Sequence, residues 1–236
     1  MSSVVDRYSL VRERIAAAAR RAGRDSGQVK LVAVSKGRLA EAIRELYQLG
    51  QRDFGENRVE EAGDKIMAAR AEKLDIIWHM IGHIQSRKAR AVAASFDWVH
   101  SVDEATLAER LNRHLIRPLP ILLECNVSGE EAKYGLPAER FDADPAQWEA
   151  LCATIESVLA QPNLQVHGLM TMAPVAAGPE QARPVFRRLR ALRDRLATRW
   201  PATDWRELSM GMTDDFEVAV EEGATMVRVG RAIFES

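Results

Sequence analysis

Short apolar segments alternate along the chain with segments in which apolar residues recur at helical spacing. The clearest apolar segment, residues 30–36, is rich in β-branched residues and is bounded by Gly27 and Gly37, which predicts a buried strand that ends in a lysine. Further strands are predicted at 76–82, 98–102, 119–127, 164–170, 207–212 and 225–230, and a segment at 53–57 is too short to assign alone.

Helices are predicted between these strands. The first helix carries its apolar residues at Val4, Tyr8, Val11, Ile15, Ala18 and Ala22, and Gly23 ends the pattern. The remaining helices are predicted at 39–50, 59–71, 87–94, 103–115, 148–159, 186–196 and 214–222. Asp103 is expected to be an N-cap, and Asp214 with Glu217 resembles a capping box. The polar segment 128–145 is a candidate lid, because loops of this length are usually functional or disordered.

Counting 53–57, the chain repeats strand then helix eight times after one extra helix. Strict alternation predicts parallel strands, so we expect an α/β protein with a (β/α)8 TIM barrel and an additional N-terminal helix. No break in composition divides residues 1–236, which are expected to form a single domain. An open doubly wound sheet is the alternative, but no GxGxxG motif follows the first strand.

Composition narrows the classes of partner. The chain is 47% hydrophobic and 28% charged, and its net charge of -1 does not favour nucleic acid or an anionic membrane surface. No hydrophobic run approaches the length of a membrane span, and the first residues lack the form of a signal peptide. Cys125 and Cys152 are expected to be buried thiols, so we expect a cytoplasmic protein. The arginines of 183–195 are expected to form a solvated helix face.

In such a barrel, the residues at the carboxyl ends of the strands share one active face. They are Lys36, Glu56, Asn57, Gly82, His83, Ser101, Asn126, Met170, Thr171, Ser209, Gly211, Arg228, Gly230 and Arg231. Barrels often bind phosphate in the loops after the last two strands. The loops here contain Ser209, Gly211, Gly230 and Arg231, whose hydroxyl, backbone N–H groups and guanidinium suit a phosphate dianion.

Lys36 adds a second chemistry to this face. A lysine next to apolar walls at the end of a buried strand can have a lowered pKa and form a Schiff base with an aldehyde, although it can also simply mark where the strand reaches the surface. A lysine amine beside a phosphate site fits an aldehyde that carries a phosphate, for which pyridoxal 5'-phosphate (PLP) is the obvious candidate.

Several segments resemble the family of the pyridoxal phosphate homeostasis proteins. They lie at residues 31–36, 54–57, 78–86, 168–172, 208–215 and 227–234, in the order in which the family has them. The resemblance implies the barrel of the N-terminal domain of alanine racemase without that enzyme's second, all-β domain.

The resemblance also implies roles for individual residues. Lys36 would form the internal aldimine, Asn57 would lie near the ring, and Arg228 would lie next to the pyridine nitrogen. Ser209, Gly230 and the backbone of Arg231 would hold the phosphate. The family usually has threonine or serine where this chain has Arg231, and often a threonine and a proline after the lysine, where this chain reads Gly37-Arg38-Leu39.

We expect a protein that buffers and delivers PLP with little or no catalysis, since an arginine at the pyridine nitrogen makes the cofactor a poor electron sink. No residue is assigned a catalytic role. The alternative is a PLP-dependent racemase or lyase, which would need an acid or base such as Lys133 or Tyr134. A third candidate is a barrel that binds another phosphorylated metabolite, with Lys36 as a phosphate ligand. Expected partners are PLP and, transiently, PLP-dependent apo-enzymes, with the protein a monomer.

His79 and His83 are separated by four positions, so on one strand they would share a face. They could therefore be read as metal ligands. A third ligand at suitable spacing is lacking, and we therefore expect no metal site.

Overall fold

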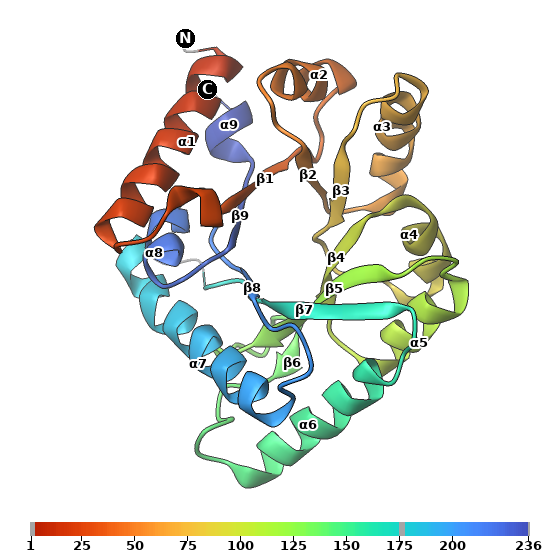
Figure 1. Ribbon diagram of the computed structural model, residues 1–236, viewed down its shortest axis with the longest axis vertical. Coiled ribbons are helices and arrows are strands. Elements are labelled where there is room, and N and C mark those ends of the chain that lie inside the picture. Colours follow the sequence, from red (N-terminus) through yellow and green to blue (C-terminus); the bar gives the residue numbers. More distant parts are fainter. Residues whose placement is uncertain (1–2, 175–177, 236) are drawn as a thin grey trace.

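Parallel strands form a closed ring, with helices on its outside (Figure 1). The computed structural model describes residues 3–174 and 178–235. The barrel strands are β1 (Lys30–Val34), β2 (Asp53–Glu56), β3 (Ile77–Met80), β4 (Trp98–Val102), β5 (Leu119–Asn126), β7 (Leu164–Met170), β8 (Glu207–Ser209) and β9 (Met226–Val229). Each strand pairs in parallel with its neighbours, and the β4–β5 and β1–β9 pairings complete the ring. The TIM barrel is confirmed, and the open sheet is excluded.

The extra helix at the start of the chain is also present. The helices are α1 (Val4–Arg21), α2 (Ala40–Gln48), α3 (Val59–Ala71), α4 (Ala89–Ser95), α5 (Ala105–His114), α6 (Pro145–Leu159), α7 (Arg183–Arg199), α8 (Phe216–Glu221) and α9 (Arg231–Phe234). A capping box opens α1, in which the Ser3 hydroxyl accepts from the N–H of Asp6 and the Asp6 carboxylate accepts from the N–H of Ser3. The helix packs along α8 and α9 (Figure 1). None of the described helices has the length and apolar character needed to span a membrane.

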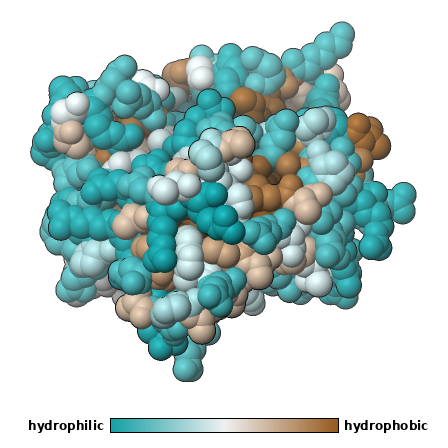
Figure 2. Space-filling model, turned by 60° about the horizontal axis from the view of Figure 1, so that its bottom comes forward, coloured by the Kyte–Doolittle hydropathy of each residue, from teal (hydrophilic) through white to brown (hydrophobic). Residues whose placement is uncertain are grey.

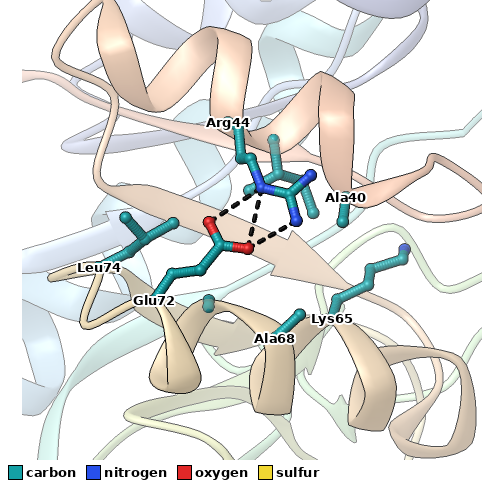
Figure 3. A pocket seen from close by; sticks show the side chains of 8 residues that line it. Ala40, Arg44, Lys65, Ala68, Glu72 and Leu74 are labelled. Carbon is teal, nitrogen blue, oxygen red and sulfur yellow. Dashed lines mark hydrogen bonds and ion pairs between the residues drawn. The ribbon is translucent and has the colours of Figure 1, made fainter.

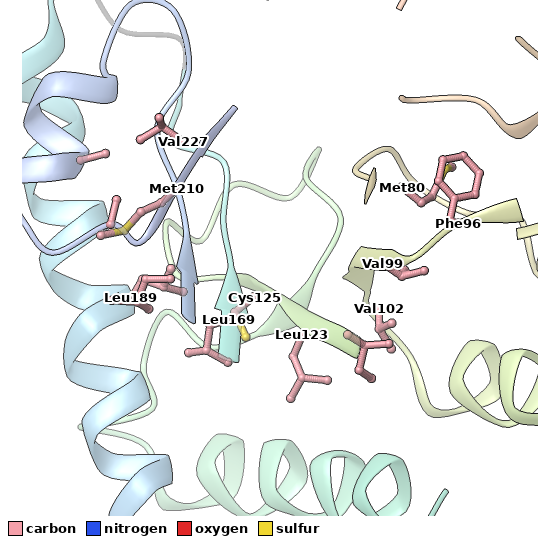
Figure 4. Close-up of a cluster of buried hydrophobic side chains, with 14 of the residues drawn as sticks. Met80, Phe96, Val99, Val102, Leu123, Cys125, Leu169, Leu189, Met210 and Val227 are labelled. Atoms are coloured by element: carbon pink, nitrogen blue, oxygen red, sulfur yellow. The ribbon is translucent and has the colours of Figure 1, made fainter. Parts of the chain in front are cut away.

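The main hydrophobic core lies between the barrel and its helices. Side chains on the outer face of the strands, such as Leu123 and Leu169, pack towards apolar residues of the helices, such as Leu189 (Figure 4). The stripe predicted for α7 is fully buried, at Phe186, Leu189, Leu192 and Leu196. The helices therefore hold their places because each buries one apolar stripe against the strands.

The inside of the barrel is filled by a second set of side chains. Leu122, Met170 and Met226 form a buried apolar cluster there, against which Trp98 and Met172 pack. The barrel interior is therefore a packed core and not a pore, as is usual for this fold.

Two predicted helix caps are wrong. Helix α5 begins at Ala105 with Glu104 at its N-cap position, while the carboxylate of Asp103 lies 3.1 Å from Nδ1 of His83. Helix α8 begins at Phe216, Asp214 pairs with Arg231, and Glu217 pairs with Arg14. In each case a partner from a distant part of the chain takes the carboxylate that the sequence pattern assigns to a local cap.

Some boundaries also differ from those predicted. Strand β1 ends at Val34, two residues before Lys36, and the short 53–57 segment does contain a strand. The 128–145 segment contains a short strand, β6 (Leu136–Pro137), which pairs with β5. Ala138 and Phe141 of this segment are buried. It is therefore folded against the barrel and is not a structureless loop.

Ion pairs join neighbouring helices at the surface. Arg44 of α2 donates from Nε and Nη2 to the carboxylate of Glu72, across a small hollow between α2 and α3 (Figure 3). The arginines of α7, predicted to form a solvated face, also take part in ion pairs. Arg183 pairs with Glu180, Glu221 and Glu222. Hydrophilic residues cover most of the face in Figure 2, and hydrophobic ones gather in one area of it.

Glu222 is the most buried carboxylate in these helix contacts, at 4% exposure. Nitrogen atoms of Arg183 and Arg187 lie 2.7 and 3.1 Å from one of its oxygens. Burial opposes ionisation of Glu222, but these arginines outweigh it and hold its pKa below the ordinary value. The folded protein therefore binds a proton at Glu222 less readily than the unfolded chain does.

We expect Glu222→Gln to lower the free energy of unfolding at pH 7 by about 1 to 3 kcal/mol, because Arg183, Arg187 and Arg190 lose a charged partner. The folded pKa is depressed, so this contribution is complete above the ordinary pKa of 4.5 and is lost as the pH falls through the folded value. Urea denaturation of both proteins between pH 7 and pH 3 measures it. Glu156→Gln, at an exposed pair with Arg199, is the control and should change stability by under about 1 kcal/mol. A difference at Glu222 that does not shrink in acid would contradict the assignment.

Candidate functional site

The predicted site residues lie on four strands that are neighbours around the barrel, in the order β2, β1, β9 and β8. Asn57 follows β2 and Lys36 follows β1. Ser209 ends β8, and Gly211 is close behind it; Arg228 lies on β9, with Gly230 and Arg231 just after. The closure of the ring therefore brings the first strand of the chain beside the last one, and the predicted residues gather at one part of the carboxyl end.

Lys36 lies just beyond the carboxyl end of β1. Val32 of β1 is in register with Arg228 of β9, and Val34 lies against Gly230, where a Cβ would be 3.1 Å from the Val34 carbonyl oxygen. Strand β1 ends at Val34, and Lys36 lies two residues further on, in the turn that follows the strand. Its side chain is exposed, which differs from the expected enclosure by apolar walls. Residue 36 therefore follows a strand end that lies beside Gly230, in the loop after β9.

A buried ionic group fixes the residue before Lys36. Ser35 donates through its hydroxyl to Oε1 of Glu56 at 2.7 Å. The ammonium of Lys65, on α3, donates to the same oxygen at 2.8 Å and to the carbonyl of Ser35 at 2.7 Å. Of the two lysines near this strand end, Lys65 is thus held in an ion pair, while Lys36 has no polar partner among the described residues.

The loop after β1 is joined to the helix that follows β9. The guanidinium of Arg38 lies 2.6 Å from a carboxylate oxygen of Glu235 and over the ring of Phe234. Arg231 directs its side chain towards Asp214, so its guanidinium is already paired. Beside it, the hydroxyl of Thr213 accepts from the N–H of Ala232 at 3.3 Å. An anion at this loop would therefore meet backbone N–H groups and Thr213, a residue that the sequence analysis did not select.

Gly211 has a structural requirement of its own. Its φ is +93°, and a Cβ at this position would lie 2.5 Å from Cβ of Ala219 on α8. Its carbonyl oxygen accepts from the N–H of Arg228 at 3.0 Å. Gly211 therefore allows α8 to pack closely and links the ends of β8 and β9.

Arg228 is a buried cation near the carboxyl end of β9, with 4% of its surface exposed. Nη1 donates to the hydroxyl of Ser209 at 2.6 Å and Nη2 to the carbonyl of Thr171 at 2.9 Å. Burial lowers the pKa of Arg228 to about 10, so the guanidinium is still protonated at neutral pH. A guanidinium has five N–H donors, and the described residues leave three of them for a ligand.

Ser209 lies deeper in the barrel than expected for a residue that binds a phosphate at the carboxyl-terminal rim. It is fully buried, and its hydroxyl lies 2.6 Å from Arg228 and 2.9 Å from Nδ1 of His100. The structure therefore brings Ser209 together with Arg228, and it does not place the hydroxyl at the loop of Gly230 and Arg231.

Glu124 is a site residue that the sequence analysis missed. It lies on β5 two residues after Leu122 of the inner apolar cluster, it is 3% exposed, and none of the described residues hydrogen-bonds to its carboxylate. Burial, with the nearby charge of Asp103, raises the pKa of Glu124 to about 7, against the opposing effect of Arg228. A carboxylate at an inward position of an otherwise apolar strand was the signal available in the sequence.

The two histidines read as possible metal ligands do not share a face. His79 is buried inside the barrel, whereas His83 lies beyond the end of β3 and stacks on Tyr134 with ring centroids 3.8 Å apart. The strand ends at Met80, so the alternation that placed both on one face does not extend to His83. Among the described residues, no group of three His, Cys, Asp or Glu side chains is arranged to hold a metal ion.

The candidates for a second acid or base both have partners. The ammonium of Lys133 donates to the carbonyl of Met172 at 3.0 Å and pairs with Glu130 at 3.0 Å. Tyr134 is stacked on His83 as described above. Both residues therefore lie at the carboxyl end of the barrel, on the side of β3, β5 and β7, across the ring from β1 and β9.

Comparison with known proteins agrees with this geometry. Residues 8–236 match the family model described as alanine racemase, N-terminal domain. Curated relatives named pyridoxal phosphate homeostasis protein include those of Aquifex aeolicus (40% identical, 97% of this chain and 96% of the relative) and Pseudomonas aeruginosa (42% identical, 99% and 96%). PipY of Synechococcus elongatus, solved with PLP bound, superposes with a TM-score of 0.78 at 37% identity over 95% of this chain and 99% of PipY.

A more distant structure shares the fold alone. Alanine racemase of Corynebacterium glutamicum is 17% identical, with a TM-score of 0.64, and the match covers 95% of this chain but 59% of that enzyme. The closed barrel and the match to the family model together define a protein of the alanine racemase N-terminal domain class. Within that class, the chain belongs to the family of the pyridoxal phosphate homeostasis proteins.

The raised pKa of Glu124 has a measurable consequence. The folded pKa lies above the ordinary value of 4.5, so ionisation is more favourable in the unfolded chain, and the wild type loses stability as the pH rises from 4.5 to about 7. We expect Glu124→Gln, which carries no titrating group, to gain about 2 to 3 kcal/mol relative to the wild type over this interval. Denaturation curves at several pH values measure this, with the exposed Glu131→Gln as the control. A constant difference from pH 4.5 to pH 8 would show that Glu124 has an ordinary pKa.

Proposed function

We propose that this protein binds PLP as a Schiff base on Lys36 and buffers and delivers it, with little or no catalysis of its own. The observation that carries the proposal is the contact between the ends of β1 and β9, which brings the strand end before Lys36 beside Gly230, two residues after Arg228. The names of the relatives and the PLP bound to PipY support the same ligand.

The groups around Lys36 fit such a ligand. The amine can add to an aldehyde with loss of water, so that a C=N bond replaces the C=O bond. The backbone N–H groups of Gly230 and Arg231 and the hydroxyl of Thr213, which already accepts from the N–H of Ala232, suit a phosphate at the adjoining loop. The free N–H donors of Arg228 suit an acceptor such as a ring nitrogen, and Asn57 lies at the end of the neighbouring strand.

The role of Arg228 supports a carrier more than an enzyme. When bound, PLP supplies an aldehyde and a ring that can withdraw electrons from a neighbouring carbon. The guanidinium of Arg228 stays protonated at neutral pH, with a pKa of about 10, and cannot accept a hydrogen bond from a protonated ring nitrogen. Arg228 would therefore favour an unprotonated ring nitrogen in a bound PLP, and this would weaken the electron withdrawal that racemisation needs.

The alternative is a PLP-dependent racemase or lyase. Racemisation needs a base on each side of the substrate carbon, and Lys36 could serve one side. Lys133 is held by Met172 and Glu130, so it is not poised as a free base, and Tyr134 is stacked on His83. These contacts favour the carrier. The remaining predictions are transient delivery to PLP-dependent apo-enzymes, a monomeric state and a cytoplasmic location.

Loss of the Lys36 amine should abolish covalent binding. We expect the wild type incubated with PLP to show the absorption band of a Schiff base and to retain the ligand after borohydride reduction. Lys36→Ala and Lys36→Arg should lose both properties, because neither variant has a primary amine there. The matched control is Lys65→Arg, which keeps a cation beside Ser35 and Glu56 and should retain the band.

Reduction followed by peptide mapping decides between the candidates. A modified peptide that contains another lysine would refute the assignment of Lys36. A protein with no band in the wild type, but with Lys36-dependent affinity for other phosphorylated metabolites, would instead support the third candidate, in which Lys36 is a phosphate ligand.

The carrier and the enzyme differ in turnover. We expect the PLP-loaded protein to racemise or cleave amino acids at least about a thousandfold more slowly than the median enzyme turnover of about 10 per second. Chiral chromatography after incubation with single L- and D-amino acids measures this. Turnover at an ordinary enzymatic rate that Lys133→Ala or Tyr134→Phe removes would establish the alternative.

A further inference from the structure

A continuous line of polar side chains crosses the barrel interior below Arg228. Asp53, at the amino end of β2, lies 2.9 Å from Nε2 of His79, and Lys30, at the amino end of β1, pairs with the same carboxylate oxygen at 3.1 Å. Nδ1 of His79 lies 2.9 Å from Nε2 of His100. Nδ1 of His100 lies 2.9 Å from the hydroxyl of Ser209, which accepts from Arg228. None of these groups beyond Arg228 and Ser209 has a part in the proposed function.

The two histidines are deeply buried. Both side chains have no exposed surface, and the imidazole rings meet edge to face with centroids 5.0 Å apart. Burial is the largest effect on each ring and lowers the pKa of both, so both are neutral at pH 7. Burial also opposes ionisation of Asp53, but the contacts with His79 and Lys30 outweigh it and lower its pKa. The line therefore consists of one carboxylate and two neutral imidazoles.

The charge states of Asp53 and the two imidazoles determine which nitrogen of each ring carries the hydrogen. An ionised carboxylate only accepts, so His79 carries its hydrogen on Nε2 and donates to Asp53. Neutral His79 then has a bare Nδ1, which accepts from Nε2 of His100. His100 in turn has a bare Nδ1, which accepts from the hydroxyl of Ser209. All hydrogens thus point towards Asp53, and the oxygen of Ser209 is left as an acceptor for Arg228.

We propose that Asp53, His79 and His100 are positioning residues that make the Ser209 hydroxyl an obligatory acceptor and so hold the guanidinium of Arg228 towards the ligand site. A serine hydroxyl free to rotate can turn its hydrogen towards a guanidinium, which only donates, and the contact is then lost. The hydrogen bonds that run from Asp53 through His79 and His100 prevent this rotation, although Asp53 lies at the opposite end of the barrel. The effect on PLP rests on the proposed function, whereas the order of the hydrogens does not.

The first test needs no ligand. Long-range ¹H–¹⁵N NMR of histidine-labelled protein reports which ring nitrogen carries the hydrogen. We expect His79 and His100 both to carry it on Nε2 at pH 7, and Ser209→Ala to weaken this preference at His100. A hydrogen on Nδ1 of either ring, or a protonated His100, would overturn the proposal. If the wild type does not bind PLP at all, the proposed function fails and this measurement alone decides the inference.

The second test distinguishes the role of Nδ1 of His100 from that of its Nε2. His100→Asn can place an acceptor near the Nδ1 position, facing Ser209, and His100→Gln can place a donor near the Nε2 position, facing His79. We expect Gln to weaken PLP binding about tenfold and to shift the absorption band of the bound ligand, and Asn to stay within about threefold of the wild type. The reverse order would overturn the proposal.

A double variant shows whether His100 acts through Ser209. We expect the pair His100→Gln and Ser209→Ala to bind PLP within about twofold of Ser209→Ala alone, because the hydroxyl that His100 controls is then absent. Full additivity of the two losses would mean that His100 has only a general packing role. Circular dichroism checks that each variant is folded, and if His100→Gln is not, the wild-type NMR result and the comparison of His100→Asn with Ser209→Ala still decide.

Discussion

The pairing of β1 with β9 is the interaction on which the site depends. These strands are far apart in the sequence, and their parallel register sets Val32 beside Arg228 and brings the end of β1 against Gly230. Because a parallel ring has all carboxyl ends on one side, this pairing brings the strand end before Lys36 beside the strand end that carries Arg228 and leads to Gly230. The ionic group of Ser35, Glu56 and Lys65 and the pair of Arg38 with Glu235 then hold the adjoining loops in place.

The barrel interior combines two kinds of packing. An apolar cluster of Leu122, Met170 and Met226 fills one part, and the other part carries Arg228, Glu124 and the line of histidines. Buried charge is costly unless each group has partners, which explains why Arg228 is bonded to both Ser209 and Thr171. Among the described residues the carboxylate of Glu124 has no such partner, and burial raises its pKa to about 7. The charged side chains of Arg228 and Glu124 are thus both buried inside the barrel.

Prediction from the sequence succeeded where the signal is local or periodic. Alternation of apolar strands with helices predicted the barrel, and strand ends predicted that Lys36, Asn57, Gly230 and Arg231 share one face. It failed where a distant partner competes with a local one, as at Asp103 and Asp214, whose carboxylates bind His83 and Arg231 in place of helix caps. It also missed Glu124, although a carboxylate in an otherwise apolar strand was a signal, and His100, whose partners become visible only when the inner face of the barrel is known.

The sequence by itself determined the order of elements, the closed parallel barrel and the family, because hydrophobic period and motifs are properties of neighbouring residues. Only the tertiary structure decided which groups are paired and which are left for a ligand. Ser209 illustrates this: its motif suggests a phosphate ligand, yet its hydroxyl is held inside the barrel by Arg228 and His100. The physical reason is that hydrogen bonding and burial depend on contacts across the ring, between strands that the chain itself separates by many residues.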